Sequence, residues 1–171
     1  MKTAGLMIDF QDRILNVMSG RDLLIKNTQI LLNGLKILNI NLITSEQNPQ
    51  KLGATSEIFS PFLGKIYAKN EFSCLGNKAL KDEILKFDHL IVFGIEAHIC
   101  VLQSVKDLLK MGKKVTLIAD AVASKDEQNR QIALNLMANL GAEVSCVQSV
   151  LFEILKTSEH QNFKEISKLI R

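Results

Sequence analysis

The fold of this chain is decided by the stretch Gly94-Ile95-Glu96-Ala97-His98-Ile99-Cys100-Val101, which joins an apolar strand to an amphipathic helix. The preceding residues 90–93 are all apolar. An unbroken apolar run is typical of a strand in a parallel sheet that helices cover on both faces. After the stretch, apolar side chains recur at helical spacing until Gly112, a residue type that commonly ends helices. A strand that runs directly into a helix predicts an α/β fold.

The same succession of strand and helix recurs on both sides of this stretch. Strands are predicted over residues 4–8, 40–43, 65–68, 90–93, 115–119 and 143–147. Helices are predicted over residues 22–38, 101–112, 124–141 and, as one or two segments, 154–170. Such alternation, with right-handed crossovers, implies a three-layer α/β/α sandwich around a mostly parallel, Rossmann-like six-stranded sheet.

Several helix residues predict where the helices begin and which sides they bury. Ser124 is expected to form a capping box with Glu127 at the start of its helix. The buried face of that helix is expected to hold Ile132, Ala133, Leu136, Met137 and Leu140. Gly34 is a weak point inside the helix over residues 22–38. The C-terminal segment is expected to turn Phe163, Ile166 and Ile170 inward.

Composition predicts one compact domain over residues 1–171. The 171 residues are 47% hydrophobic and 23% charged with a net charge of +3, which excludes disorder as the dominant state. The basic residues form no cluster, so we expect no nucleic-acid partner. No apolar run approaches the roughly 20 residues of a membrane span, and Asp9 interrupts the first apolar segment too early for a signal peptide. Three widely spaced cysteines indicate reduced thiols and a cytoplasmic location.

The sequence predicts no cofactor and no metal site. It contains neither a Gly-x-Gly-x-x-Gly motif nor a phosphate-binding P-loop. The tightest grouping of potential metal ligands is Glu96 with His98, which is too small for a site. The absence of Gly-x-Ser-x-Gly argues against a serine hydrolase of the α/β class.

Three chemically complementary groups follow predicted strands, where parallel sheets bind their ligands. Asp9 follows the first strand, Lys69 follows the third, and Cys100 lies in the first helical turn after the fourth. A carboxylate, an ammonium and a thiol at one edge suit nucleophilic catalysis on an acyl carbon. Each residue also has an ordinary alternative role: Asp9 in a turn, Lys69 on the surface and Cys100 in the core.

The position of Cys100 favours a reactive thiol. In the first turn of a helix, the helix dipole and free N–H groups both favour the thiolate, and a nearby Lys favours it further. Glu96, Ala97 and His98 are poor N-caps, so those N–H groups stay free to stabilise an oxyanion. Rapid alkylation of Cys100 by iodoacetamide below neutral pH would indicate an activated thiol, whereas a rate like those of Cys74 and Cys146 would favour a scaffold function.

Other chemically active residues are expected to be structural. Cys74 and Cys146 have the pattern of core or surface thiols, and His98 is expected to point away from Cys100. Asp120 is expected to organise the loop after the fifth strand.

Five motifs, in this order, resemble those of the isochorismatase-like cysteine hydrolases over nearly the whole chain. They lie at residues 6–12 (LMIDFQD), 44–49 (TSEQNP), 69–73 (KNEFS), 94–101 (GIEAHICV) and 119–124 (ADAVAS). The fourth motif is the most specific. The resemblance implies a catalytic triad of Asp9, Lys69 and Cys100. In that triad Cys100 attacks the acyl carbon, Asp9 acts as general base and then acid, and Lys69 holds Asp9 ionised.

The resemblance also implies the surroundings of this triad. A cis peptide bond is expected between Ile95 and Glu96. It would turn the N–H of Glu96 toward the pocket, where it forms an oxyanion hole with the N–H of Cys100. Phe10 and Phe72 are expected to form walls of the substrate pocket.

Departures from the family narrow the expected function. Members that hydrolyse nicotinamide carry metal-binding histidines after the second strand, and residues 45–53 contain no His. Nicotinamidase activity and a bound zinc or iron are therefore not expected. Because Cys100 is retained, we expect acyl transfer to water from an amide-like C–N bond. The chain looks most like the metal-free subgroup called isochorismatase domain-containing proteins.

Two other functions stay open beside a hydrolase of a small-molecule substrate. One is an oligomeric binding or scaffold protein with little turnover, and the other is a thiol-redox role for Cys100. Family resemblance also implies a homo-oligomer, whether dimer, tetramer or larger, with the apolar C-terminal helix as a candidate contact surface.

Overall fold

The computed structural model describes residues 1–171 and contains one six-stranded sheet in the order β3-β2-β1-β4-β5-β6. Every neighbouring pair of strands is parallel. The strands are β1 (Thr3–Ile8), β2 (Asn41–Gln47), β3 (Ile66–Lys69), β4 (His89–Ile95), β5 (Lys114–Ala123) and β6 (Glu143–Ser145). The predicted α/β class with a parallel six-stranded sheet is confirmed.

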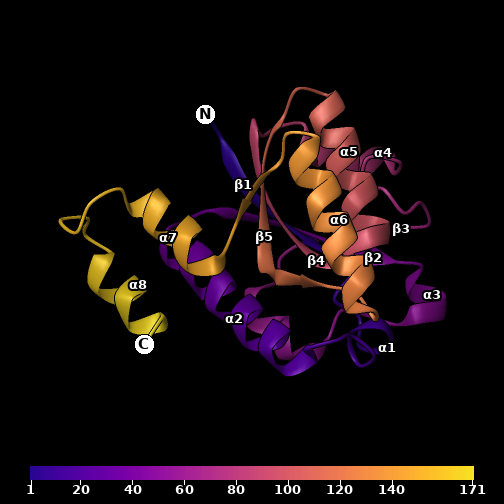
Figure 1. Cartoon of the computed structure of the whole chain (residues 1–171), viewed down its shortest axis with the longest axis horizontal. Helices are drawn as coiled ribbons and strands as arrows, with labels where there is room; N and C mark the ends of the chain where they lie inside the picture. Colours follow the sequence, from indigo (N-terminus) through magenta and orange to yellow (C-terminus); the bar gives the residue numbers. More distant parts are fainter.

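Helices cover both faces of the sheet, with α2 and α7 on one side and α5 and α6 on the other (Figure 1). The α-helices are α1 (Asp12–Leu15), α2 (Arg21–Ile37), α3 (Pro49–Leu52), α4 (Lys78–Ile84), α5 (Leu102–Lys110), α6 (Glu127–Asn139), α7 (Val147–Leu155) and α8 (Phe163–Leu169). A 3-10 helix, η1 (Glu57–Phe62), and a π-helical turn, η2 (Ala97–Val101), complete the chain. No helix has the length and apolarity that crossing a membrane would require.

The core lies on the two central strands. All seven residues of β4 are buried, and so are residues 4–8 of β1. The two strands approach closely at Gly94, where a Cβ atom would lie 2.4 Å from the carbonyl oxygen of Ile8. Only glycine fits this contact, which brings the end of β4 against the end of β1. The carboxyl ends of β1 and β4 are therefore tightly packed, and they support the residues that directly follow the two strands.

Most strands run further toward their carboxyl ends than predicted. β2 continues through Ser45, Glu46 and Gln47, which are buried although they are polar. The strand prediction stopped before these residues because it relied on apolar runs. A buried polar side chain is stable only when it is hydrogen-bonded, and the sequence does not show the partners. At the other edge β6 ends at Ser145, and Val147 begins α7.

The predicted start of α6 is wrong. The N-cap is Asp126, whose side chain accepts a hydrogen bond from the N–H of Gln128 at 2.7 Å. Ser124 is fully buried and its Oγ lies 2.8 Å from Nδ1 of His98. Ser124 therefore joins two loops at the end of the sheet and does not cap the helix.

The predicted buried face of α6 is only partly right. Its buried residues are Ala133, Leu134 and Met137. Ile132, Leu136 and Leu140 are instead 57%, 43% and 50% exposed. The helix carries two apolar stripes, and the stripe with the smaller residues packs against the protein.

The C-terminal helices pack on the chain itself. α7 and α8 lie beside α2, with α8 outermost (Figure 1). Ile166 is fully buried, Phe163 and Ile170 are partly buried against the core, and the Phe152 and Phe163 rings are 6.1 Å apart. The apolar residues of the terminal helix are therefore used within the chain, so it is a poor contact surface for another molecule.

Gly34 is a packing requirement and not merely a weak point of α2. A Cβ atom there would lie 2.4 Å and 2.7 Å from the two terminal methyl carbons of Leu151 on α7. Leu151 is fully buried, so it has little room to move. Gly34→Ala is therefore expected to lower the free energy of unfolding by about 1–3 kcal/mol in urea denaturation. This loss opposes the gain of about 0.5–1 kcal/mol that Ala normally brings to a helix.

A double-mutant cycle with Leu151→Ala separates the clash from other effects. Because truncation of Leu151 makes room for the new methyl group, the double variant should be less destabilised than the sum of the two single variants. A Gly34→Ala protein more stable than the wild type would contradict the packing argument.

Candidate active site

The carboxyl edge of the sheet brings Asp9, Lys69 and Cys100 together. Asp9 directly follows β1, Lys69 ends β3, and Cys100 lies in η2, the turn that leads from β4 into α5. The three residues are 0%, 2% and 6% exposed. The residues singled out at three separate strand ends thus converge on one buried location.

Lys69 and Asp9 form a buried ion pair, with Nζ of Lys69 2.7 Å from Oδ2 of Asp9 and both side chains fully shielded. The same ammonium donates to Oε1 of Gln47 at 2.6 Å and to the carbonyl oxygens of Phe72 at 3.1 Å and Glu71 at 3.3 Å. Burial disfavours the charged form of Lys69, but the charge of Asp9 and its hydrogen bond to the ammonium offset this effect. The pKa of Lys69 is therefore raised above its ordinary value, and Lys69 remains an ammonium.

Asp9 is held through both carboxylate oxygens. While Oδ2 faces Lys69, Oδ1 accepts a hydrogen bond from Oγ of Ser45 at 2.7 Å. The backbone of Asp9 has a φ of 58°, a left-handed conformation that Asp tolerates better than most residues. Its N–H also donates to the carbonyl oxygen of Ser45 at 3.2 Å. The carboxylate is thus fixed in place at the point where the chain leaves β1.

The resting state of Cys100 differs from the expected thiolate. Burial raises the pKa of the Cys100 thiol well above its usual range, and the charge of Asp9 and its hydrogen bond to the thiol raise it further. Lys69 lowers this pKa, but by less. Burial and Asp9 therefore oppose the thiolate that the helix start favours, and the sequence shows the helix start but not the depth of burial. Cys100 is a protonated thiol beside a carboxylate that can take its proton.

The turn before Cys100 has the features expected of an uncapped helix start. Glu96 precedes η2 and its side chain caps no N–H group of that turn. The peptide bond between Ile95 and Glu96 is cis. The Glu96 carboxylate accepts instead from the N–H of Lys125 at 2.9 Å, and its Oε2 lies 4.0 Å from Nδ1 of His98. The backbone N–H groups at this turn stay the candidates for an oxyanion hole.

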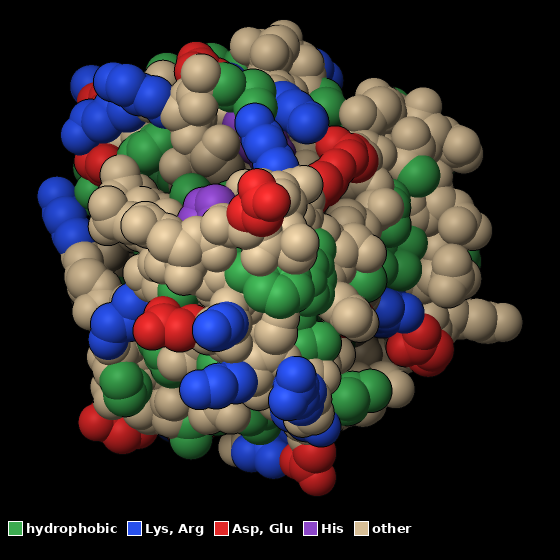
Figure 2. Space-filling view, turned by 90° about the vertical axis from the view of Figure 1, so that its left-hand side faces the viewer, with side chains coloured by type: hydrophobic (Ala, Val, Ile, Leu, Met, Phe, Trp, Pro, Cys, Tyr) green, Lys and Arg blue, Asp and Glu red, His purple; other side chains and the backbone are tan.

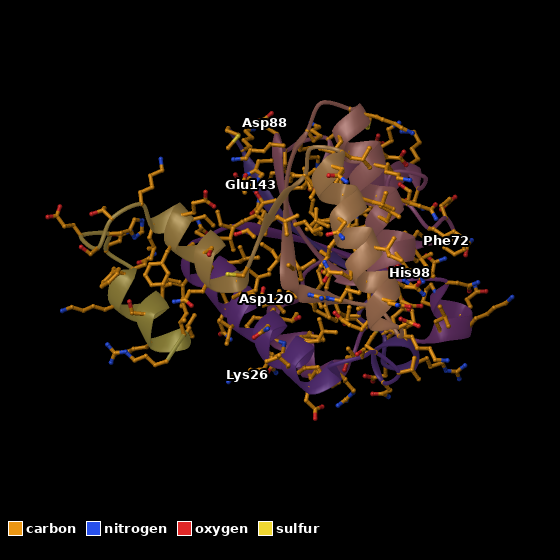
Figure 3. All side chains as sticks on the ribbon, viewed as in Figure 1. Lys26, Phe72, Asp88, His98, Asp120 and Glu143 are labelled. Atoms are coloured by element: carbon orange, nitrogen blue, oxygen red, sulfur yellow. The ribbon has the colours of Figure 1, made fainter.

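The two predicted pocket walls lie in different environments. Phe10 is fully buried in the core, with its ring centroid 5.2 Å from that of Phe59 and 6.3 Å from that of Phe93. Phe10 therefore packs in the aromatic part of the core, and its role as a pocket wall stays a prediction. Phe72 is 53% exposed. Figure 3 shows it and His98 away from Asp88 and Glu143, which lie at the amino-terminal ends of strands.

Two polar residues of β2 belong to the site although sequence reasoning gave them no role. Ser45 contacts Asp9, and Gln47 lies between Lys69 and Cys100. Their position in the sequence could have indicated a place in the site. Both residues follow the apolar part of a strand, at the same edge of the sheet as Asp9 and Lys69.

The remaining cysteines and Asp120 have structural contacts. Cys74 is fully buried, its Sγ lies 3.7 Å from Oγ of Ser45, and burial raises the pKa of its thiol to about 11. Cys146 caps α7 by accepting from the N–H of Ser149 at 3.5 Å. Asp120 accepts from the N–H of Val147 at 2.9 Å and so ties the end of β5 to α7.

The structure also bears on metal binding. No group of three or more His, Cys, Asp or Glu side chains is arranged to hold a metal ion.

A thiol, an ammonium and a carboxylate thus lie buried together at the carboxyl edge of a parallel sheet, where α/β proteins bind their ligands. Residues 3–149 match the family model described as "Isochorismatase domain". The chain therefore belongs to the isochorismatase family, which confirms the resemblance noted in its motifs.

Similar proteins span animals and bacteria. The chain is 33% identical over 172 residues to isochorismatase domain-containing protein 1 of Salmo salar, covering 99% of this chain but 61% of that protein. It thus spans about three fifths of that relative's length. The structure described as MAR1 ribonuclease from Caenorhabditis elegans has a TM-score of 0.93 at 31% identity, covering 99% of this chain and 89% of that one. The YcaC gene product of Escherichia coli, described as an octameric hydrolase of unknown specificity, shares the fold with a TM-score of 0.91 at 19% identity, covering 99% and 86%.

Proposed function

We propose that this protein is a metal-independent cysteine hydrolase that cleaves an amide-like C–N bond of a small molecule through an acyl-enzyme on Cys100. The observation that carries the proposal is the buried cluster in which Nζ of Lys69 lies 2.7 Å from Oδ2 of Asp9 and 2.6 Å from Oε1 of Gln47, while Sγ of Cys100 lies 3.7 Å from the same Oε1. A thiol, a base and a cation that orients the base are the components of nucleophilic acyl transfer.

In the first half of the reaction, the thiol proton passes to the Asp9 carboxylate as Sγ of Cys100 attacks the acyl carbon. The oxygen of the resulting tetrahedral intermediate receives hydrogen bonds from the N–H groups of Glu96 and Cys100. When the C–N bond breaks, Asp9 returns the proton to the leaving nitrogen, and a thioester remains on Cys100. Lys69 stays protonated throughout and stabilises the ionised state of Asp9.

In the second half, a water molecule attacks the thioester carbon while Asp9 takes one of its protons. Collapse of the second tetrahedral intermediate releases the carboxylic acid, and Asp9 returns the proton to the sulfur of Cys100. Each turnover begins and ends with a protonated Cys100 and an ionised Asp9, since the original thiol proton leaves with the amine and a proton from water replaces it.

The surface around the end of β3 is polar. A hollow of about 220 Å³ there is lined mostly by polar residues, among them Asn48, Asn70, Glu71 and Asn77, whereas Asp9 and Cys100 do not line it. On the face shown in Figure 2, Lys and Arg side chains are interspersed with Asp and Glu side chains. That face, on the side of α7 and α8 and away from Phe72 and His98, therefore has no continuous basic surface of the kind that a nucleic-acid backbone requires.

The test is to trap the acyl-enzyme. The protein is incubated with a panel of small primary amides and carbamoyl compounds, and intact mass and amine release are measured together. We expect an adduct that maps to Cys100, that hydroxylamine removes, and that is absent from Cys74 and Cys146. A panel with neither adduct nor amine release, or cleavage of a single-stranded RNA that persists in Cys100→Ala, would overturn the proposal.

We further propose that the protein is a homo-oligomer in which α6 contacts a second copy of the chain. Ile132, Leu136 and Leu140 project from α6, and Val144 on the neighbouring edge strand β6 is 42% exposed. No residue between Gln131 and Ala142 is charged. Uncharged, apolar surfaces are typical of interface centres, and a surface without charge meets its own copy without repulsion.

Leu136→Glu is expected to convert the oligomer into monomers of about 19.1 kDa in light scattering, because it would bury a charge at the contact. Leu23→Glu is the matched control, since Leu23 is 62% exposed on α2. A wild-type protein that is itself monomeric, or dissociation by Leu23→Glu alone, would contradict this assignment.

We also propose that the protein acts in the cytoplasm. All three cysteines are free, which suits a reducing compartment. Immunofluorescence of the tagged full-length protein tests this assignment, and accumulation in a secretory compartment would contradict it.

A further inference from the structure

We propose that Gln47 is a positioning residue that holds the sulfur of Cys100 in its protonated form while the site is empty. Gln47 is the last residue of β2 and its side chain lies between Lys69 and Cys100. Its Oε1 accepts a hydrogen bond from Nζ of Lys69 at 2.6 Å and one from Sγ of Cys100 at 3.7 Å. One amide oxygen therefore contacts both the ammonium and the nucleophile.

The orientation of this amide is fixed by the surrounding backbone. Nε2 of Gln47 donates to the carbonyl oxygen of Asn70 at 2.8 Å, and only the nitrogen end of the amide can make that bond. Gln11 holds the backbone of Gln47 on both sides, since its Oε1 accepts from the N–H at 2.7 Å and its Nε2 donates to the carbonyl oxygen at 2.9 Å. The side-chain oxygen is thus held toward Lys69 and Cys100.

An acceptor at this position opposes formation of the thiolate. A carbonyl oxygen stabilises a thiol through its S–H group and repels a thiolate. It also occupies an N–H group of Lys69 that would otherwise be available to the sulfur. The titratable groups that act on Cys100 are Asp9 at the end of β1, Lys69 at the end of β3 and Cys74 in the loop before α4. Among them only Lys69 favours ionisation, and Gln47 lies between Lys69 and the sulfur.

This arrangement gives the empty site a thiol that is slow to react with alkylating agents and oxidants. In the reaction, which here rests on the proposed function, the proton leaves the sulfur for Asp9 only when an acyl carbon is available. The first readout of the test below uses the thiol itself and needs no substrate, so it fails or succeeds independently of the hydrolase proposal.

The experiment measures the rate of Cys100 alkylation by iodoacetamide from pH 6 to 11 in two variants with opposite expected effects. Gln47→Met removes the acceptor at similar size, so the pH midpoint should fall and the rate at pH 7.5 should rise about tenfold, equivalent to one pKa unit. Gln47→Glu replaces it with a charged acceptor, so the midpoint should rise and the rate at pH 7.5 should fall about tenfold. Peptide mass spectrometry reads Cys100 separately from Cys74 and Cys146.

A control variant distinguishes positioning from loosening of the strand end. Glu46→Gln weakens the hydrogen bonds that Oε1 of Glu46 accepts from the N–H and the Oγ1 hydroxyl of Thr55, and leaves the Cys100 contacts unchanged. Loosening of the end of β2 would change the alkylation rate of Cys100 by the same factor at every pH. It would leave the pH midpoint of alkylation unchanged. The proposal is overturned if Glu46→Gln shifts the midpoint as Gln47→Met does, or if the two Gln47 variants shift it in the same direction or not at all. If Gln47→Met does not fold, the direction of the Gln47→Glu shift decides alone.

Discussion

Cys100→Ala is expected to lower the turnover of an amide substrate by at least about a thousandfold, because it removes the sulfur on which the proposed acyl-enzyme forms. Cys74 is the nearest alternative thiol, but it is fully buried with a pKa of about 11 and faces Ser45. The measurement is amine release under saturating substrate, with circular dichroism to show that the fold is retained.

Cys146→Ala is the matched control for this prediction. Cys146 lies at the start of α7 and has no contact with Asp9 or Lys69, so its loss should leave turnover near the wild-type value. Turnover that survives in Cys100→Ala would remove the covalent mechanism. It would then favour a scaffold function or chemistry that uses another nucleophile.

The oxidation behaviour of Cys100 distinguishes the hydrolase from a redox function. A redox-sensing cysteine is an accessible thiol of low pKa, whereas Cys100 is 6% exposed and burial raises its pKa above the usual range. Asp9 also opposes thiolate formation at rest. These properties favour general-base activation during a reaction over permanent activation of the thiol.

The strand ends were predictable because apolar runs locate parallel strands and the carboxyl edge collects the ligand-binding residues. This reasoning reached Asp9, Lys69 and Cys100, and the family motifs gave them roles. It did not reach Gln47, because a polar residue inside a strand has no pattern of its own. Its role follows from contacts with Lys69 and Asn70, which are distant in sequence.

Burial and helix orientation are the properties that the sequence left undetermined. The thiol of Cys100 was expected to be ionised because its place at a helix start is a local feature, whereas the desolvation that dominates its pKa arises from tertiary packing. In α6, helical spacing identified apolar residues but not which stripe faces the sheet. The smaller stripe with Ala133 packs inside, and the stripe with Leu136 is exposed.

Lys69→Met is expected to cause the second large effect, a loss of about 3–5 kcal/mol in the free energy of unfolding at neutral pH. Removal of the ammonium leaves the Asp9 carboxylate buried without its partner, since both side chains are fully shielded in the wild type. Because the folded-state pKa of Lys69 is raised, its contribution is fully present below the unfolded value of 10.5 and is lost as pH rises through the folded value. Wild-type stability should therefore show no loss from this pair between pH 6 and 9.

The double variant Lys69→Met/Asp9→Asn shows whether the buried charge is the cause. Neutralising the carboxylate removes the unpaired charge, so the double variant should recover most of the stability that Lys69→Met loses in urea unfolding. It should recover no turnover, because Asn cannot accept the proton of Cys100. If Asp9→Asn fails to rescue stability, the loss comes from packing of the lysine stem, and the ion pair is not what holds this edge of the sheet together. Recovered stability without turnover would instead separate the two roles of the pair: Lys69 balances the charge that folding buries, and Asp9 carries the proton that the reaction moves.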